Sequence, residues 1–242
     1  EAQQCEKQND WSRAIDLYRA AIQIRPDFLE AHHNLAVALR NDGQAEIALK
    51  SAQFAAALAP DHPTVQFSLG VSLEQVGHSD EAINAYTKSV NLRPSYIAAL
   101  SNLGRLLEVK GRLAESIEIL ERALALAPSA SAVLLNLANS ALLAGNPQRT
   151  TELLKKLIEN DLNISEVSHS LASNSFGVAA HVMGERAPAI AHFREAIATS
   201  PDFAEAHENL AQALLFEEEY EEAWLEYEWR WLNESNRQTK RL

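Results

Sequence analysis

Apolar residues along the chain recur at helical spacing, in pairs of segments. Within residues 27–60 the first segment carries Ala31, Leu35, Ala36 and Leu39, and the second carries small residues at similar steps. Steps of three and four residues fit the 3.6-residue period of an α-helix and not the alternation of a strand. Small residues at a crossing point let two helices approach closely. The pattern therefore predicts an all-α protein built from pairs of packed helices.

Glycine and proline show that these pairs repeat every 34 residues. The residues that keep this step are Gly43, Gly77, Gly111 and Gly145, and Pro26, Pro60, Pro94 and Pro128. A glycine after the first helix supplies the positive φ that closes it, and a proline stops the second helix. A fixed period of this length indicates copies of one helix-turn-helix unit stacked side by side. We therefore predict an α-solenoid, whose long repeated surface suits binding.

The repeat gives the domain organisation, a single array over residues 1–242. We place its units at residues 1–26 (partial), 27–60, 61–94, 95–128, 129–162, 163–201 and 202–242 (a terminal unit or cap). The step from Gly145 to Gly184 is 39 residues, which places an insertion near residues 160–168. We interpret it as a longer helix end or an extra loop. A tolerated surface insertion is favoured over a change of superhelical pitch or a hinge, because lengthening a loop costs little.

The special positions of each unit carry a family resemblance. They are Leu69-Gly70, Leu73, Ala82, Tyr86 and Pro94, and one period later Leu103-Gly104, Leu107, Ser116, Leu120 and Pro128. This spacing resembles the tetratricopeptide repeat. The resemblance implies a right-handed superhelix in which the first helix of each unit lines a concave groove that binds a protein or a peptide.

Composition and charge narrow the range of partners. The net charge is −12 and the pI is about 5.1, and no basic stripe follows the chain, so nucleic acid is not expected. No apolar run is long enough to span a bilayer, so membrane insertion is not expected either. The single cysteine, Cys5, excludes an intramolecular disulfide and favours a reducing, cytoplasmic compartment.

Candidate catalytic or metal-binding groups do not form a pattern in the sequence. None of the eight histidines makes an i, i+4 ligand pair, and His32 and His207 occupy equivalent sites in two repeats, which indicates a structural role. There is no glycine-rich phosphate loop, and carboxylates on a solenoid are usually a solvated face. We therefore expect this segment to be no enzyme and to need neither a metal nor a cofactor.

Amide side chains instead mark a candidate binding groove. Four units place asparagine nine residues before the turn, and two place serine; these residues are Asn34, Asn102, Asn136 and Asn209, and Ser68 and Ser175. An amide offers donors and an acceptor, so a row of them can hold the main chain of an extended peptide. The row resembles the asparagine ladder in the superhelix of O-GlcNAc transferases. Alternatively, these amides bond to neighbouring helices and only fix the stack.

Further groove residues follow from the same helical face. His33 and Phe67 lie one position before the ladder, while Arg105 and Asn139 lie three positions after it. We expect Phe67, Arg105 and Asn139 to provide selectivity. In chaperone-binding tetratricopeptide domains, lysine and arginine at these positions clamp a C-terminal carboxylate. Here Arg105 is flanked by glutamates, so we do not expect such a clamp. We expect the groove to bind a peptide of mixed polar character.

The last unit is rich in aromatic residues. Trp224, Tyr227 and Trp231 fall on one helical stripe that is expected to cover the end of the core, and Trp229 lies off it, leaving aromatic surface. The segment resembles the Trp-Tyr-Glu-Trp-Arg-Trp signature of bacterial tetratricopeptide proteins, in which a glycosyltransferase-like domain often follows. These residues therefore form a terminal cap or a docking seam for another domain.

These observations support three hypotheses about function. The first is a protein-interaction scaffold that binds an extended peptide in its groove. The second is the non-catalytic, substrate-presenting region of a larger glycosyltransferase-like enzyme, whose catalytic domain lies beyond Leu242. The third is a self-associating platform, which makes a homo-oligomer.

Overall fold

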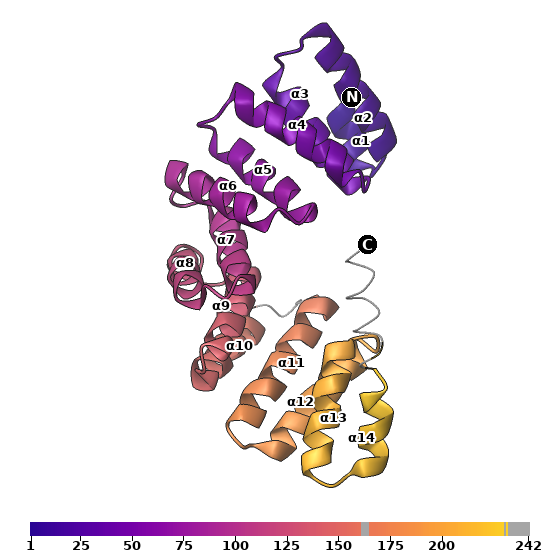
Figure 1. Cartoon of the computed structure of the whole chain (residues 1–242), viewed down its shortest axis with the longest axis vertical. Coiled ribbons are helices and arrows are strands. Elements are labelled where there is room, and N and C mark those ends of the chain that lie inside the picture. Colours follow the sequence, from indigo (N-terminus) through magenta and orange to yellow (C-terminus); the bar gives the residue numbers. More distant parts are fainter. Residues whose placement is uncertain (161–164, 230, 232–242) are drawn as a thin grey trace. The chain divides into compact units, whose positions relative to one another are not determined.

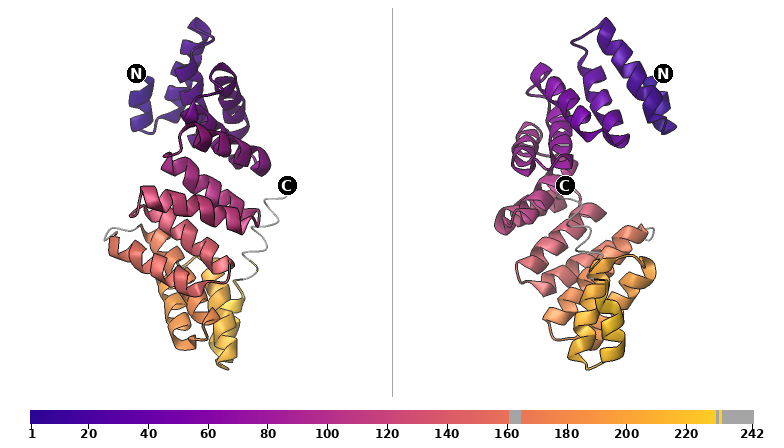
Figure 2. Two further views of the ribbon diagram at one scale, coloured as in Figure 1. Left: turned by 90° about the vertical axis from the view of Figure 1, so that its left-hand side faces the viewer. Right: turned by 45° about the vertical axis from the view of Figure 1, so that its right-hand side comes forward.

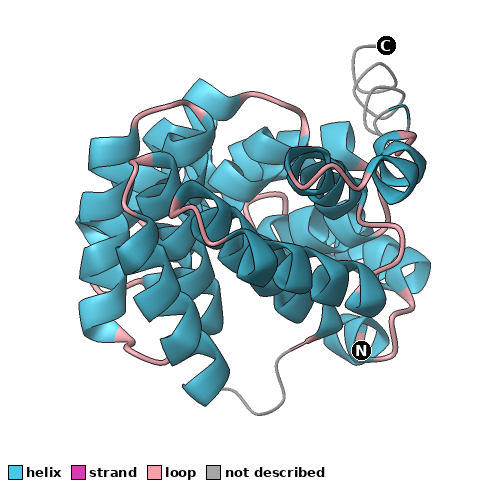
Figure 3. Cartoon of the chain, turned by 90° about the horizontal axis from the view of Figure 1, so that it is seen from below, coloured by secondary structure: helices cyan, strands magenta, loops and turns pink. Residues whose placement is uncertain are grey.

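The computed structural model describes residues 1–160, 165–229 and 231, and all regular elements in these ranges are α-helices (Figure 3). In chain order they are α1 (Ala2–Lys7), α2 (Trp11–Ile24), α3 (Leu29–Asn41), α4 (Ala45–Leu58), α5 (Pro63–Gln75), α6 (Ser79–Leu92), α7 (Ile97–Val109), α8 (Leu113–Leu126), α9 (Ser131–Leu143), α10 (Pro147–Asn160), α11 (Glu166–Val182), α12 (Arg186–Thr199), α13 (Ala204–Phe216) and α14 (Tyr220–Tyr227). Odd-numbered helices open a repeat and even-numbered helices close one. The all-α class predicted from the sequence is confirmed.

The chain forms two compact parts, residues 1–112 with α1 to α7 and residues 113–242 with α8 to α14. Within each part, helices that follow one another in sequence pack together, and opening helices also contact each other, as α3 does α5 and α9 does α11 (Figures 1 and 2). The large side chains fully buried between these helices include Leu39, Tyr86, Leu100, Leu134, Leu154 and Phe193. The opening helices of each part thus share one surface, which we call its opening-helix surface.

In each repeat, one residue of the turn between the two helices has a positive φ. The turn glycines have φ between +72° and +82°: Gly43, Gly77, Gly111, Gly145 and Gly184. The first and last repeats use Asn9 (φ 57°) and Glu218 (φ 63°) at the same place. Residues with a Cβ rarely adopt this conformation, which is why glycine fills the other turns.

The insertion near residues 160–168 affects α11. This helix has 17 residues, whereas α9 and α13 have 13, and the extra turn lies at its start because α11 ends two residues before its turn glycine, as α9 does. Residues 161–164 of the insertion lie outside the described residues, as do residue 230 and residues 232–242 of the terminal unit. The described part of the insertion is therefore a longer helix.

Two helical glycines allow the helices of a repeat to pack closely. A Cβ built on Gly70 would lie 2.6 Å from carbon atoms of the Tyr86 ring, and one built on Gly177 would lie 2.4 Å from the Phe193 ring. Each glycine thus makes room for the aromatic ring of the closing helix. This packing fixes the spacing of the opening helices, which carry the candidate site.

Candidate functional site

A pocket on the opening-helix surface of residues 1–112 crosses three successive repeats. Its volume is about 300 Å³. Residues of α1, α3, α5 and the turn before α5 line it: Gln3, Leu29, Glu30, His33, Asn34, His62, Thr64 and Val65. The structure therefore brings together two of the residues predicted from the sequence, His33 and Asn34, and adds side chains from the repeats on either side.

The spacing of residues on α3 extends this surface away from the pocket. His33, Val37 and Arg40 are related by steps of four and three residues, so they lie on one face of the helix. A long helical side chain points back over the preceding turn, so the guanidinium of Arg40 covers the turn that lies toward His33. All three side chains are half-buried.

Several polar atoms near this face are buried without a hydrogen-bond partner. Among the described residues they are Tyr18 Oη, His33 Nδ1, Arg40 Nη1 and Ser68 Oγ, and all four belong to residues 1–112. Ser68 is 2 % exposed and Tyr18 is 6 % exposed. Buried polar groups in native proteins are nearly always paired, so these four atoms are exceptions, and one of them belongs to His33, which lines the pocket.

The charge of this cluster resides on Arg40. Burial lowers the pKa of His33, and the neighbouring Arg40 and His62 lower it further, so the imidazole is neutral at pH 7. Burial also lowers the pKa of the Arg40 guanidinium, which nevertheless stays protonated as arginine does. Burial, with the nearby carboxylate of Glu6, raises the pKa of Tyr18 to about 12, so this hydroxyl is neutral as well.

The next predicted residues along this surface are engaged with one another. Tyr86 Oη donates to Glu74 Oε2 at 2.9 Å and accepts from Asn102 Nδ2 at 3.4 Å, while Arg105 forms an ion pair with Glu74. Burial and Glu74 raise the pKa of Tyr86, which keeps the hydroxyl protonated as a donor. The half-buried Phe67 packs against the Tyr86 ring, with 5.8 Å between ring centroids. Arg105 and Asn102 are thus fixed in a network.

The ladder positions in residues 113–242 also bond to side chains. Asn209 Nδ2 donates to Asn174 Oδ1 at 3.0 Å, and Ser175 Oγ donates to Asn139 Oδ1 at 2.9 Å. Asn136 is half-buried on α9. In this part of the chain the contacts agree with the alternative interpretation of the ladder, in which the polar residues connect neighbouring repeats.

Equivalent residues at the start of the opening helices have a structural role. The ring nitrogen Nε2 of His32 lies 2.8 Å from the carbonyl oxygen of Pro26, and that of His207 lies 2.8 Å from the carbonyl oxygen of Pro201. Gln66 Nε2 donates to Pro60 O in the same way. Each side chain holds the end of the preceding repeat, as the sequence position suggested. No group of three metal-ligating side chains occurs in the part of the chain that the structure describes.

The aromatic residues of the last repeat differ from expectation. Trp229, expected to lie off the packed stripe, stacks on the ring of His207 with 4.0 Å between centroids, and His207 also pairs with Glu226. Trp224 and Trp231, expected to cover the core, are 56 % and 53 % exposed. For Trp231 the reason is that α14 ends at Tyr227, and the amides of Trp229 and Trp231 bond to carbonyls three residues back, so the helical stripe does not continue to Trp231. Trp224 lies within α14, and its exposure has no such explanation.

Arg40 and Ser68 are the residues of this surface whose importance the sequence analysis missed. Arg40 lies three residues after Val37, so extending the groove face by one more helical step would have included it. The sequence did not show that Arg40 would lack a carboxylate partner. The equivalent positions of the next two repeats hold Glu74 and Glu108, so the repeat pattern gives no guide to the partner of an arginine there. Ser68 was noted only as a substitute for asparagine.

Comparisons with known proteins identify the type of repeat. A family model described as a tetratricopeptide repeat matches residues 33–97, 67–131, 101–161 and 175–235, and one described as a TPR repeat matches residues 3–43. No curated protein matches the chain significantly by sequence.

Solved structures with a similar fold include a tetratricopeptide repeat protein from Parabacteroides merdae ATCC 43184. It has a TM-score of 0.75 and 18% identity, over 94% of this chain and 88% of that one. Pseudomonas aeruginosa PilF has a TM-score of 0.72 and 19% identity, over 87% and 94%. YrrB, described as a TPR protein with an unusual peptide-binding site, has a TM-score of 0.62 and 19% identity, over 78% and 95%. Across the described residues, no helix combines the length and the apolar character needed to cross a membrane.

Proposed function

We propose that the chain, which belongs to the tetratricopeptide repeat family, is a protein-interaction scaffold. Its opening-helix surface in residues 1–112 binds an extended peptide segment of a partner protein. The proposal concerns binding, and the side chains it uses are those that line the pocket on this surface.

The observation that carries the proposal is the pocket that crosses α1, α3 and α5. A peptide lying across these helices contacts three repeats at once, and each repeat contributes different side chains to it. Asn34 can donate to a peptide carbonyl and accept from a peptide amide with the same side chain. Because the helices fix the pocket in advance, binding costs little ordering of the scaffold.

Two further observations favour residues 1–112 over residues 113–242 as the peptide site. The buried polar atoms that lack partners lie in the first part, whereas Asn209 and Ser175 of the second part already bond to side chains of adjacent repeats. The structural similarity to YrrB, whose description includes a peptide-binding site, is compatible with this role. A peptide in the pocket of the first part leaves the network of Asn102, Tyr86 and Glu74 in place, whereas a peptide on the ladder of the second part has to replace the hydrogen bonds of Asn209 and Ser175.

The test begins with selection of binding peptides from a random display library on the purified protein. We expect peptides to be enriched. The double variant His33→Ala/Asn34→Ala should bind them about tenfold more weakly, because it loses hydrogen bonds between uncharged groups that together contribute about 1.4 kcal/mol. Asn84→Ala is the matched control, because Asn84 is an exposed asparagine on the closing helix α6. Hydrogen exchange should show protection by the peptide in α3 and α5.

Two results would contradict the proposal. One is a selection that enriches no peptide above the background of an unrelated protein. The other is unchanged affinity in the double variant, with circular dichroism showing that its helices are intact. In the second case the bound peptide contacts some other surface of the repeats.

A further inference from the structure

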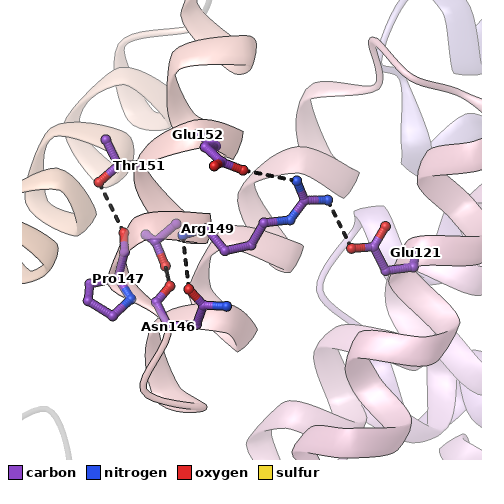
Figure 4. Close-up of polar contacts among 7 residues, drawn as sticks. Glu121, Asn146, Pro147, Arg149, Thr151 and Glu152 are labelled. Atoms are coloured by element: carbon purple, nitrogen blue, oxygen red, sulfur yellow. Dashed lines mark hydrogen bonds and ion pairs between the residues drawn. The ribbon is translucent and has the colours of Figure 1, made fainter.

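Arg40 is distinguished from the other half-buried arginines by its lack of a counter-charge. Among the described residues the half-buried arginines are Arg40, Arg105 and Arg149. Arg105 pairs with Glu74, and Arg149 reaches Glu121 at 3.0 Å and Glu152 at 3.2 Å (Figure 4). Within the described ranges Arg40 makes no ion pair, and its buried Nη1 has no hydrogen-bond partner. A partly desolvated guanidinium in this condition is unfavourable, and an incoming anion would relieve it.

Two further side chains on the opening helices α3 and α5, His33 and Ser68, also have a polar atom without a partner. His33 lies two turns earlier on the same face of α3, close enough for the guanidinium charge to lower its pKa. Ser68 lies on α5, which packs against α3, and its buried hydroxyl is unpaired. Tyr86 is also near enough to influence Arg40, but its hydroxyl is already bonded to Glu74 and Asn102. The unpaired groups are therefore Arg40, His33 and Ser68, from two adjacent opening helices.

We propose that Arg40, on the same face of α3 as His33, binds the carboxylate of an aspartate or glutamate side chain within the peptide that occupies this surface. This inference rests on the proposed function and specifies the chemistry of its ligand. The half-buried guanidinium of Arg40, which lacks a counter-charge, donates to the carboxylate oxygens.

A carboxylate fits the charge of this cluster better than a phosphate does. Arg40 contributes one positive charge, and the imidazole of His33 is neutral at pH 7. Arg105, another cation on this surface, forms an ion pair with Glu74. A singly charged carboxylate matches one guanidinium, whereas a phosphate group carries close to two negative charges and usually recruits several cations.

A side-chain carboxylate fits the geometry better than the end of a peptide. The pocket with His33 and Asn34 lies toward the start of α3, Arg40 lies near its end, and α5 packs beside α3. A peptide that passes Arg40 with an internal acidic residue can continue in both directions. A peptide that ends at Arg40 would leave one of these regions unused.

The distribution of charge also directs an acidic ligand to residues 1–112. This part contains 13 acidic and 11 basic residues, whereas residues 113–242 contain 20 acidic and 10 basic residues. The second part therefore repels an acidic peptide over distances of about 10 Å at moderate ionic strength. In the first part, the local positive charge of Arg40 decides where the acidic residue binds.

The experiment uses one selected peptide with an acidic residue and the same peptide with Asp→Asn or Glu→Gln, both amidated at the C-terminus. Fluorescence anisotropy gives the dissociation constants. We expect the wild-type chain to prefer the acidic peptide by about tenfold, which corresponds to about 1.4 kcal/mol. Arg40→Gln should bind the two peptides equally, and Arg40→Lys should keep part of the preference because the charge is retained.

Arg149→Gln is the matched control, since it removes a half-buried arginine whose charge is already paired; it should keep the full preference. Circular dichroism and thermal melting show whether each variant is folded. An unchanged preference in folded Arg40→Gln would overturn the inference while leaving the scaffold proposal intact, and so would equal binding of both peptides by the wild type. If no peptide binds, both proposals fail. A third peptide with a free C-terminus tests the remaining source, and a preference for the free end alone would also overturn the inference.

Discussion

Residues 1–112 and residues 113–242 are built on the same repeat but differ in how their polar groups are satisfied. In the second part, buried side-chain donors find acceptors in neighbouring helices, as Thr150 Oγ1 does with the carbonyl oxygen of Ala138 at 3.0 Å and Ser175 does with Asn139. In the first part, Arg40, His33 and Ser68 each keep an atom without a partner. The repeat sets the positions of these side chains, and their chemical identity decides whether the surface is complete.

This difference shows that packing and binding are separable in this fold. Gly70 with Tyr86 and Gly177 with Phe193 use the same close contact, one pair in each part. Yet Tyr86 adds a hydroxyl that organises Glu74 and Asn102, whereas Phe193 has none. A stack of repeats can therefore keep its hydrophobic core while the polar side chains on one surface differ from repeat to repeat, bonded to one another in some and unpaired in others.

The largest expected effect comes from the packing that both parts share. Gly70→Ala and Gly177→Ala each place a methyl group under 3.0 Å from a buried ring, so each should lower the free energy of unfolding by about 3 kcal/mol. Urea denaturation followed by circular dichroism measures this. Replacing the facing ring by leucine in the same chain, Tyr86→Leu or Phe193→Leu, should recover part of the loss. A loss well below 1 kcal/mol in either part would show that the two parts do not share this packing.

The second prediction compares two arginines on the surface of residues 1–112. Arg105→Gln leaves the carboxylate of Glu74 without its cation and should destabilise the chain by about 2 kcal/mol. Arg40→Gln removes a charge that has no partner, so stability should change by less than about 0.5 kcal/mol or rise. Thermal and urea unfolding of both variants provide the values. If Arg40→Gln were the more destabilising of the two, Arg40 would have a structural partner and would not be an open site.

The fold was predictable from the sequence because the repeat supplies independent copies of each signal. The turn glycines, the terminating prolines and the helical spacing of Leu35 and Leu39 all indicate the same unit, and the structure confirms the helix pairs. The first and last turns were less evident, because Asn9 and Glu218 replace glycine there. Repetition makes an error at one position unimportant for the fold.

The candidate site was predictable only in part, because sequence gives the face of a helix but not the partners of a side chain. His33 and Asn34, predicted as groove residues, line the pocket, and their role in binding stays a prediction. Arg105, predicted to provide selectivity, forms an ion pair with Glu74 that the sequence analysis did not specify. Arg40, like Arg105, is a half-buried arginine. The sequence does not show that its charge is unpaired, whereas the structure does. The stacking of Trp229 on His207 was likewise not deducible, since it depends on where α14 ends.

A third prediction compares two ladder asparagines. Asn209→Ala removes the donor to Asn174 and should cost about 1 kcal/mol of unfolding free energy. Asn34→Ala, which lines the pocket beside the Tyr18 hydroxyl, should cost no more stability than Asn209→Ala while weakening peptide binding. Parallel urea titrations and anisotropy measurements separate the two quantities. A large stability loss for Asn34→Ala without any effect on peptide binding would indicate that both asparagines only fix the stack.

The smallest effect is a pH dependence of stability that belongs to residues 1–112. The pKa of His33 is lower in the folded chain than its unfolded value of about 6.5, so the unfolded chain takes up the proton first. The stability that His33 contributes is therefore complete above about pH 6.5 and is lost as the pH falls below it. His33→Gln should show a smaller drop in unfolding free energy between pH 7.5 and pH 5.5 than the wild type does.

Arg40→Gln should reduce the same drop, because the guanidinium is one cause of the lowered pKa. His78→Gln, which changes an exposed imidazole, serves as the control. An equal drop in the wild type and His33→Gln would mean that His33 is solvated in solution and does not lie beside the unpaired charge of Arg40.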